Sequence, residues 1–536
     1  MSKDNNFLKG AATLGIAGVI VKILGAIYRI PLSNIISDEG MGYYQTAYPF
    51  YQLLLTLSTA GFPVAIAKLV STKRAIGDHK NAYKVFKVAL MGLLMGGILT
   101  SLFVAIGAKP IVESLGNSDA YYSLIALVPA LFFVPIMAAF RGFFQGRQTM
   151  APTAISQVME QLFRVIFGLS LTLLLINKGT PIAAGGASFG GSAGAIVGTL
   201  IMFYIFLKNK PELHKEIASG IIDKEYPVHT IVKDLLMIAI PITIGSAIAP
   251  IMDTIDTGLV LNRLQSINFT EKEANALFGQ LKGMAQTLIN LPQVFSVAIA
   301  MSLVPSISDS YVRNKKNEIK NTISSGIRIT LLIGLPCAFG LFVLSTPIIK
   351  LLYYKNTIET INSIGEILAY LSFGVIFLTL VQALTAILQG LGKPFMPVKN
   401  LALGAAIKVI LTYILTAIPA INIKGAAIST VSAYAVAAIL DFVDVAKLTR
   451  IKFNYFNIIA KPFISAVGMA IMARLGFLLF ENILGNNLAT ILAVLVGVVV
   501  YVILLVITGS VTAEDLALIP KGEKIAKKLE KFKLIK

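Results

Sequence analysis

The sequence is poor in charge and nearly free of cysteine and histidine. Of its 536 residues only 14% are charged and 56% are hydrophobic, whereas a soluble protein carries about 25% charged residues. The single cysteine, Cys337, excludes a disulfide framework and a cysteine-based metal site. Histidine occurs only at His79, His214 and His229, in no metal-site or catalytic pattern, and no ATP-binding motif is present. We therefore expect no enzyme and no resident cofactor.

Long apolar segments recur along the whole chain instead. The mean hydropathy is +0.79, and the segments have the length of about 20 residues that a membrane-spanning helix needs. They do not alternate in polarity as the strands of a membrane barrel do. The sequence thus predicts an all-α polytopic membrane protein with about 14 transmembrane helices. The expected segments are 10–36, 44–70, 83–108, 120–145, 153–176, 188–208, 231–262, 277–308, 324–353, 363–389, 397–418, 425–446, 457–481 and 488–508.

The formal net charge of +19 lies mostly in short loops and in the C-terminal tail. Basic loops such as STKRAIGDHK (71–80) follow the even-numbered segments, whereas SDEGMG (37–42) and the glycine-rich stretch 179–194, both expected as loops, carry few cations. The positive-inside rule then predicts that both termini are cytoplasmic. We expect this positive charge to contact the headgroups of membrane lipids and not nucleic acid.

Two motifs occur twice. VAIA stands at 64–67 and at 297–300, and RGFFQGRQTMAPTAISQVMEQLFRV (141–165) matches TAILQGLGKPFMPVKNLALGAAIKV (385–409), with offsets of 233 and 244 residues. The second match pairs Gln145 with Gln389, Gly146 with Gly390 and Arg164 with Lys408. Such a duplication predicts two six-helix lobes around a central cavity, related by an axis along the membrane normal.

The repeat also predicts the domain organisation. The expected parts are an N-terminal lobe (1–207), a cytoplasmic linker (208–229), a C-terminal lobe (230–448), two further segments (449–510) and a basic amphipathic tail (511–536) that lies on the inner leaflet.

Several cations lie inside the apolar segments. In VKILGAIYRIPLSNII (21–36), Lys22 and Arg29 are seven residues apart and so share a helix face to within about 20°. Charges at this depth usually face a bundle interior or a water-filled cavity. With Arg164, Lys408 and Lys282 they are candidate ligands of an anionic substrate. Two alternatives stay open: Arg164 pairs internally with Glu160, and Lys282 snorkels to the outer headgroups.

An acidic pair occupies the seventh segment. IAPIMDTIDTGLV (248–260) places Asp253 and Asp256 at i and i+3 on one face. The pair could bind Na⁺ or carry a proton as the coupling ion, or act as a gate. Alternatively, the two acids are solvated or hold Lys22 and Arg29. Asp441 and Asp444 are expected to be solvated, or paired with the cations that follow them.

Three stretches resemble one known family: GAIYRIPLSNIISDEGMGYYQTAYPFYQLLLTLSTAGFPVAIAKLVS (25–71), 141–165 and LPQVFSVAIAMSLVPSISDSY (291–311). They resemble the MOP superfamily, in the polysaccharide-biosynthesis branch that contains the lipid II flippases. The resemblance implies two lobes, a V-shaped central cavity and alternating access, and it supports Lys22 and Arg29 as substrate ligands. Thr56, Thr287 and Asn290 stand where other members carry further charged residues.

The resemblance implies a monomeric flippase in a bacterial plasma membrane. Its substrate would be an undecaprenyl-diphosphate-linked cell-wall precursor, with lipid II first. The alternatives are an exporter of another lipid-linked oligosaccharide, a MATE-type cation-coupled multidrug antiporter, and a scaffold for cell-wall synthesis. A basic first segment argues against cationic drugs, and buried charges argue against a scaffold.

Overall fold

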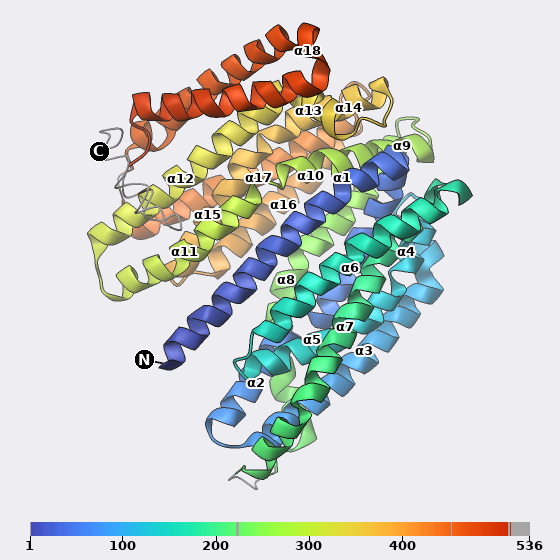
Figure 1. The fold of residues 1–536 in the computed structure, drawn as a ribbon, viewed down its shortest axis with the longest axis vertical. Helices are drawn as coiled ribbons and strands as arrows, with labels where there is room; N and C mark the ends of the chain where they lie inside the picture. The colour runs from blue at the N-terminus through green and yellow to red at the C-terminus, as the bar shows by residue number, and fades with distance from the viewer. Residues whose placement is uncertain (1, 221–224, 452, 513–514, 516–536) are drawn as a thin grey trace. The chain divides into compact units, whose positions relative to one another are not determined.

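The computed structural model describes residues 2–220, 225–451, 453–512 and 515. All regular secondary structure in these ranges is helical (Figure 1), since a helix pairs its own backbone polar groups inside a membrane. Contacts divide the chain into two compact units, which are residues 1–265 with 269–279 and residues 266–268 with 280–536.

The first unit holds nine α-helices among its described residues. They are α1 (Ser2–Thr59), α2 (Phe62–Ala75), α3 (His79–Ser114), α4 (Tyr121–Ala126), α5 (Val128–Gly146), α6 (Ala151–Leu175), α7 (Thr180–Ala218), α8 (Val228–Gln265) and α9 (Glu271–Phe278).

The second unit follows a π-helical turn, Gly279–Ala285, at the boundary of the two units. Its α-helices in the described ranges are α10 (Gln286–Ile289), α11 (Gln293–Val312), α12 (Lys316–Val343), α13 (Ser345–Leu352), α14 (Ile358–Ser372), α15 (Gly374–Gly390), α16 (Phe395–Leu415), α17 (Ile423–Thr449) and α18 (Lys461–Thr508).

The helical membrane fold is confirmed. Eleven helices in the described ranges are long and apolar enough to span a membrane, or twelve if the bent pair α14–α15 is one span. Two of them are interrupted, because α1 leaves helical geometry at Ser37 (φ 55°) and α18 does so at Gly485 (φ 71°). When the bent pair is counted as one span and α1 and α18 are divided at these breaks, the number of spans is fourteen, as predicted.

The break in α1 is stabilised by local side-chain bonds. The Ser37 hydroxyl donates to the Ile36 carbonyl at 2.7 Å, and the Asp38 carboxylate accepts from the Glu39 N–H at 2.9 Å. Short polar side chains of this kind satisfy the backbone where a helix is interrupted. The predicted loop at 37–42 is thus a sharp kink, and the chain on either side of it is helical.

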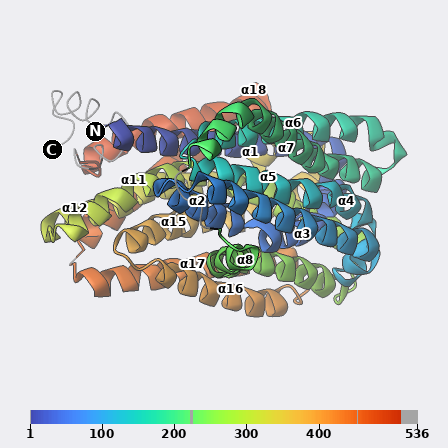
Figure 2. The same ribbon diagram turned by 90° about the horizontal axis from the view of Figure 1, so that it is seen from below.

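The prediction of a loop at 179–194 is wrong. This stretch forms most of the first half of α7, and Gly186, Gly190 and Gly194 pack against α6, which runs beside it in both views (Figures 1 and 2). A Cβ on Gly190 would lie 2.5 Å from the Arg164 carbonyl oxygen, and one on Gly194 would lie 2.4 Å from that of Glu160. Small residues four apart let membrane helices approach closely, and here they fix the face of α6 that carries Glu160 and Arg164.

The predicted repeat is visible in the helix ends. Helices α5 and α15 end at Gly146 and Gly390, and α6 and α16 begin 244 residues apart. In both turns the second residue after this glycine has a positive φ, which is 61° at Gln148 and 75° at Gly392. The packing repeats as well, since Gly146 lies against Val70 of α2 and Gly390 against Ile307 of α11.

Helix α8 belongs to the first unit by its contacts. The Gly61 N–H donates to the Thr243 hydroxyl at 3.1 Å, and a Cβ on Gly61 would lie 2.1 Å from the Ala239 carbonyl oxygen. The lobes predicted from the repeat, 1–207 and 230–448, stay a prediction. The first half of the predicted linker 208–229 is a continuation of α7 to Ala218.

Most of the predicted amphipathic tail, 513–514 and 516–536, lies outside the described residues. Its described residue Asp515 is buried and accepts two bonds from Arg328 of α12, at 2.7 Å from Nε and 2.6 Å from Nη2. The Thr512 hydroxyl accepts a third bond from Arg328 at 2.9 Å. A bidentate, buried pair is among the stronger side-chain contacts, so it anchors the chain after α18 to α12.

The close approach of α6 and α7 yields a stability prediction. We expect Gly190→Ala to lower the free energy of unfolding by about 1–3 kcal/mol, because the new methyl group meets backbone that must move. The matched control is Gly96→Ala in α3, where a Cβ meets nothing within 4 Å. Thermal melting in detergent measures both. Equal melting temperatures for the two variants would contradict the packing described.

Candidate functional site

Lys22 and Arg29 lie on the part of α1 that packs against α6. Lys22 is exposed and Arg29 is half-buried. Tyr28 sets the rotation of this part of the helix, because its hydroxyl donates to the Ala187 carbonyl of α7 at 2.9 Å. A Cβ on Gly168 of α6 would lie 2.5 Å from that hydroxyl, so glycine is needed there. The direction of the two cations therefore follows from the packing of α1 on α6 and α7.

Glu160 of α6 lies between two arginines. Its Oε2 accepts from Arg141 Nη2 at 2.9 Å, and its Oε1 is 3.8 Å from Arg164 Nη2. Arg141 also donates from Nε to the Ser156 hydroxyl at 2.9 Å. All three charged side chains are less than one-fifth exposed. Glu160 is thus bound mainly to Arg141, and its contact with Arg164 is the longer one.

This geometry bears on the alternative that Arg164 is merely an internally paired charge. The ion pair with Glu160 exists, but one carboxylate serves two guanidinium groups, so the network keeps a net positive charge. The Arg164 Nε is also buried with no hydrogen-bond partner. A buried donor without an acceptor costs about 1–3 kcal/mol, so the pairing of Arg164 within the protein is incomplete.

Four tyrosines of α1, the helix that carries Arg29, form a continuous row of rings. The kink at Ser37 folds α1 so that the Tyr28 and Tyr44 ring centroids are 6.5 Å apart, and Tyr44 is stacked on Tyr48 at 5.9 Å. Tyr51 continues the row at 5.9 Å from Tyr48. Arg29 directly follows Tyr28 in α1, and Arg164 lies one turn before Gly168, the residue of α6 against which the Tyr28 hydroxyl packs.

We call Arg29, Arg164, Tyr28, Tyr44, Tyr48 and Tyr51 the tyrosine–arginine cluster. The sequence did not lead us to predict a role for the four tyrosines or the pairing of Arg141 with Glu160. The spacing of Tyr44, Tyr48 and Tyr51 at i, i+4 and i+7 was the available signal, since it predicts one helix face. The cluster offers planar guanidinium donors, which match phosphate oxygens, next to aromatic rings and hydroxyls.

The acidic pair lies on α8 of the same unit. Asp256 is buried, at 2% exposure, whereas Asp253 is exposed. The neighbouring threonines bond to their own helix, Thr254 to the Pro250 carbonyl and Thr257 to the Asp253 carbonyl, both at 2.8 Å. The two carboxylates can supply oxygen ligands. In the described part of the chain, no group of three or more His, Cys, Asp or Glu residues is arranged to hold a metal ion.

The other two predicted cations belong to the second unit. Lys282 lies in the π-helical turn 279–285 and Lys408 lies in α16, and both are half-buried. A π-helical turn is rare and often marks a functional position. These two lysines are described within their own unit and are not members of the tyrosine–arginine cluster.

The expected surroundings of Asp441 and Asp444 are corrected by the structure. Asn400 of α16 donates to both carboxylates at 2.8 Å. Asp441 is only 1% exposed, and its Oδ2 has no hydrogen-bond partner. Asp441 is therefore a buried group linked to Asn400 and not a solvated one at the helix end.

The unequal sharing of Glu160 predicts different costs for its two arginines. Arg141→Gln should lower the free energy of unfolding by about 3 kcal/mol, because it leaves a largely buried carboxylate with only a long contact. Arg164→Gln should lower the free energy of unfolding by clearly less than this. Melting temperatures in detergent test this. A larger loss for Arg164→Gln would show that Arg164 is the structural partner of Glu160.

Comparisons with known proteins agree with this architecture. The family described as "Polysaccharide biosynthesis protein" matches residues 7–311, and the family "MatE" matches residues 282–414. The chain is 34% identical over 438 residues to the uncharacterized membrane protein YabM of Bacillus subtilis, covering 81% of this chain and 79% of that protein.

Two further matches are lipid II flippases. The chain is 28% identical over 481 residues to lipid II flippase MurJ of Bacillus subtilis, covering 88% of this chain and 87% of the relative. A solved structure of lipid II flippase MurJ in an inward closed conformation shares the fold with a TM-score of 0.67 and 17% identity, over 92% of this chain and 98% of the other. The chain is a multi-pass membrane protein that belongs to the polysaccharide biosynthesis protein family, in the flippase branch of the MOP superfamily.

Proposed function

We propose that this protein moves an undecaprenyl-diphosphate-linked cell-wall precursor, with lipid II first, between the leaflets of a bacterial plasma membrane by alternating access. The observation that carries the proposal is the surplus positive charge of the network formed by Arg141, Glu160 and Arg164. Arg29 and Arg164 lie within apolar helices, and Glu160, the acid nearest Arg164, is bound mainly to Arg141.

A flippase makes and breaks no covalent bond. Its task is to lower the cost of moving a charged headgroup through hydrocarbon, which requires cations at membrane depth. Arginine suits a diphosphate because its planar fork can bond two oxygens at once. The tyrosine rings and hydroxyls next to it suit the sugars, since an aromatic side chain offers an apolar face and a polar tip.

Two other classes of substrate are alternatives to lipid II. Another lipid-linked oligosaccharide carries the same diphosphate, and only a direct comparison separates the two. The match of residues 282–414 to the MatE family makes drug antiport a second candidate. A net positive cluster repels cationic drugs, so we favour the lipid-linked anion. We propose a monomer with cytoplasmic termini and no resident cofactor.

The aspartates of α8 are the proposed coupling site. Asp253 and Asp256 are one turn apart, one exposed and the other buried. Such a pair can bind Na⁺ through its carboxylate oxygens, the ligands that hard cations prefer, or can carry a proton. The N-terminal cations would then hold the headgroup while α8 responds to the ion gradient.

Reconstituted flipping of labelled lipid II tests the substrate proposal. Arg29→Gln and Arg164→Gln should each slow flipping by about tenfold or more, because a charged hydrogen bond contributes about 1.5–3 kcal/mol. Lys210→Gln, at an exposed position near the end of α7, is the matched control. Wild-type rates in both arginine variants, or faster transport of ethidium than of lipid II, would refute the proposal.

Imposed ion gradients test the coupling site. Proteoliposomes with the wild type should flip lipid II faster under the gradient of the coupled ion, which is Na⁺ or H⁺. Asp253→Asn should make the rate independent of both gradients. The control is Asp309→Asn, at an exposed ion pair with Arg313. If Asp253→Asn keeps the full response to the gradient, Asp253 of α8 does not couple flipping to the ion.

A further inference from the structure

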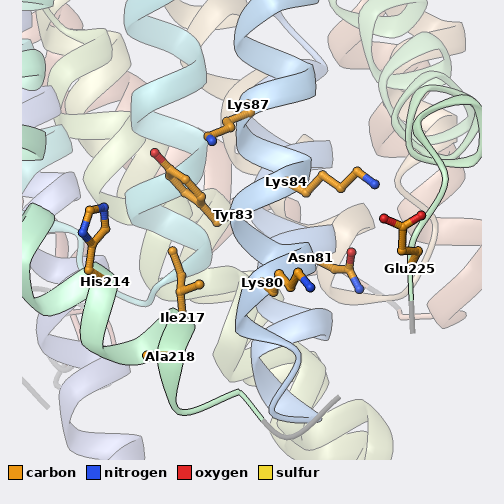
Figure 3. Close-up of a pocket in the computed structure, with 9 residues that line it drawn as sticks. All are labelled: Lys80, Asn81, Tyr83, Lys84, Lys87, His214, Ile217, Ala218 and Glu225. Atoms are coloured by element: carbon orange, nitrogen blue, oxygen red, sulfur yellow. The ribbon is translucent and has the colours of Figure 1, made fainter. Parts of the chain in front are cut away.

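A second basic site lies at the other end of the first unit from the kink in α1, where α3 begins. Figure 3 shows a pocket of about 550 Å³ with three lysines, Lys80, Lys84 and Lys87, on α3. His214 of α7 lies on one side of that helix and Glu225 on the other. We call these five residues and Tyr83 the lysine pocket. None of them is part of the tyrosine–arginine cluster.

The lysines share one face of α3. Their spacing of four and then three residues keeps all three within about 60° around a helix. Tyr83 lines the pocket, and its ring packs against those of Phe86, at 6.1 Å, and Phe143, at 6.4 Å. The Lys87 ammonium lies 4.7 Å above the same ring. The pocket lining therefore includes an aromatic ring that is packed in place and also holds one of the charges.

The wall that carries Glu225 is fixed as well. The Asn81 side-chain oxygen accepts from the Tyr226 N–H at 3.2 Å, and its nitrogen donates to the Asp78 carboxylate at 3.0 Å. The Tyr226 hydroxyl donates to Asp234 of α8. Burial and this bond raise the pKa of Tyr226 above its ordinary value, so the phenol stays a donor at neutral pH. Residues 225–227 are thus held against α3.

The charge of the pocket selects an anion. Among the described residues that line the pocket, three carry an ammonium group and one, Glu225, carries a carboxylate, and His214 adds a further positive charge when it is protonated. The volume lies within the range of about 300–1,000 Å³ that is usual for sites of small ligands. A phosphate group with its substituent fits both the charge and the size.

The depth of the pocket indicates that the anion belongs to the membrane. Lys87 is followed by 21 residues without charge, 88–108, which span about 30 Å as a helix, the thickness of the hydrocarbon core. The lysines therefore lie at headgroup level. The same face of α3 continues into the core as an exposed apolar stripe, formed by Met91, Met95, Ile98 and Leu102.

We propose that the lysine pocket binds the headgroup of an anionic glycerophospholipid, whose acyl chains lie along the apolar stripe of α3. Basic pockets between membrane helices are suited to such headgroups. A free phosphate would use the lysines but not the stripe, whereas a zwitterionic lipid would use the stripe but bring no net charge. A bound lipid would connect α3, α7 and residues 225–227, and so would stabilise the first unit.

The test is lipid binding by the purified full chain in detergent, followed by native mass spectrometry. The probes are phosphatidylglycerol, phosphatidylcholine and inorganic phosphate. The variant Lys80→Gln/Lys84→Gln/Lys87→Gln removes the three charges. The matched control, Lys208→Gln/Lys210→Gln/Lys215→Gln, removes three exposed lysines of α7 that do not line the pocket. Melting temperatures without lipid show whether each variant is folded.

We expect wild type and control to bind phosphatidylglycerol in preference to phosphatidylcholine, and the pocket variant to bind it at least about tenfold more weakly. Phosphatidylglycerol should raise the melting temperature of wild type and control but not that of the pocket variant. Equal binding by the pocket variant and wild type, or an equal loss in the control, would overturn the proposed site. Inorganic phosphate that displaces the lipid at equal concentration would overturn the lipid as its ligand.

Discussion

The sharing of Glu160 between Arg141 and Arg164 is the constraint on which the candidate site depends. Burying charge in a membrane protein is costly unless it is paired, and here one acid serves two cations at unequal distances, 2.9 and 3.8 Å. The glycines of α7 bring its backbone against this part of α6. The kink in α1 brings Tyr28, which packs on α6 at Gly168, next to Tyr44. Positive charge is thus retained inside the first unit by packing.

The two copies of the repeat share their helix ends but differ in this chemistry. With the offset of 244 residues, Arg164 corresponds to Lys408, but Glu160 corresponds to Gly404 and Arg141 to Thr385. Gly404 serves close packing, since a Cβ there would lie 2.5 Å from the Ala433 carbonyl oxygen. The arginine–glutamate–arginine network therefore belongs to the first copy alone. The second copy has instead Asn400, at the position of Ser156, bound to two aspartates.

Much of the fold follows from local sequence properties. The length of the apolar segments and the basic loops between them predict the helices, and the repeated Gln-Gly turns predict the duplication. Each of these signals depends only on residues that are close together in the sequence. The glycine-rich part of α7 was mistaken for a loop, since low side-chain hydropathy does not show that glycines four apart form a packing face. The contact between Tyr28 and the row of Tyr44, Tyr48 and Tyr51 could not be predicted, because Tyr28 and Tyr44 meet only through the kink at Ser37.

The central claim is that Arg29 and Arg164 recognise a diphosphate inside the membrane. Binding of undecaprenyl diphosphate and of undecaprenyl monophosphate, measured on the purified wild type and on an Arg29→Gln/Arg164→Gln variant of matched thermal stability, tests it most directly. The wild type should prefer the diphosphate, and the variant should bind both lipids equally and weakly. An undiminished preference for the diphosphate in the variant would contradict it.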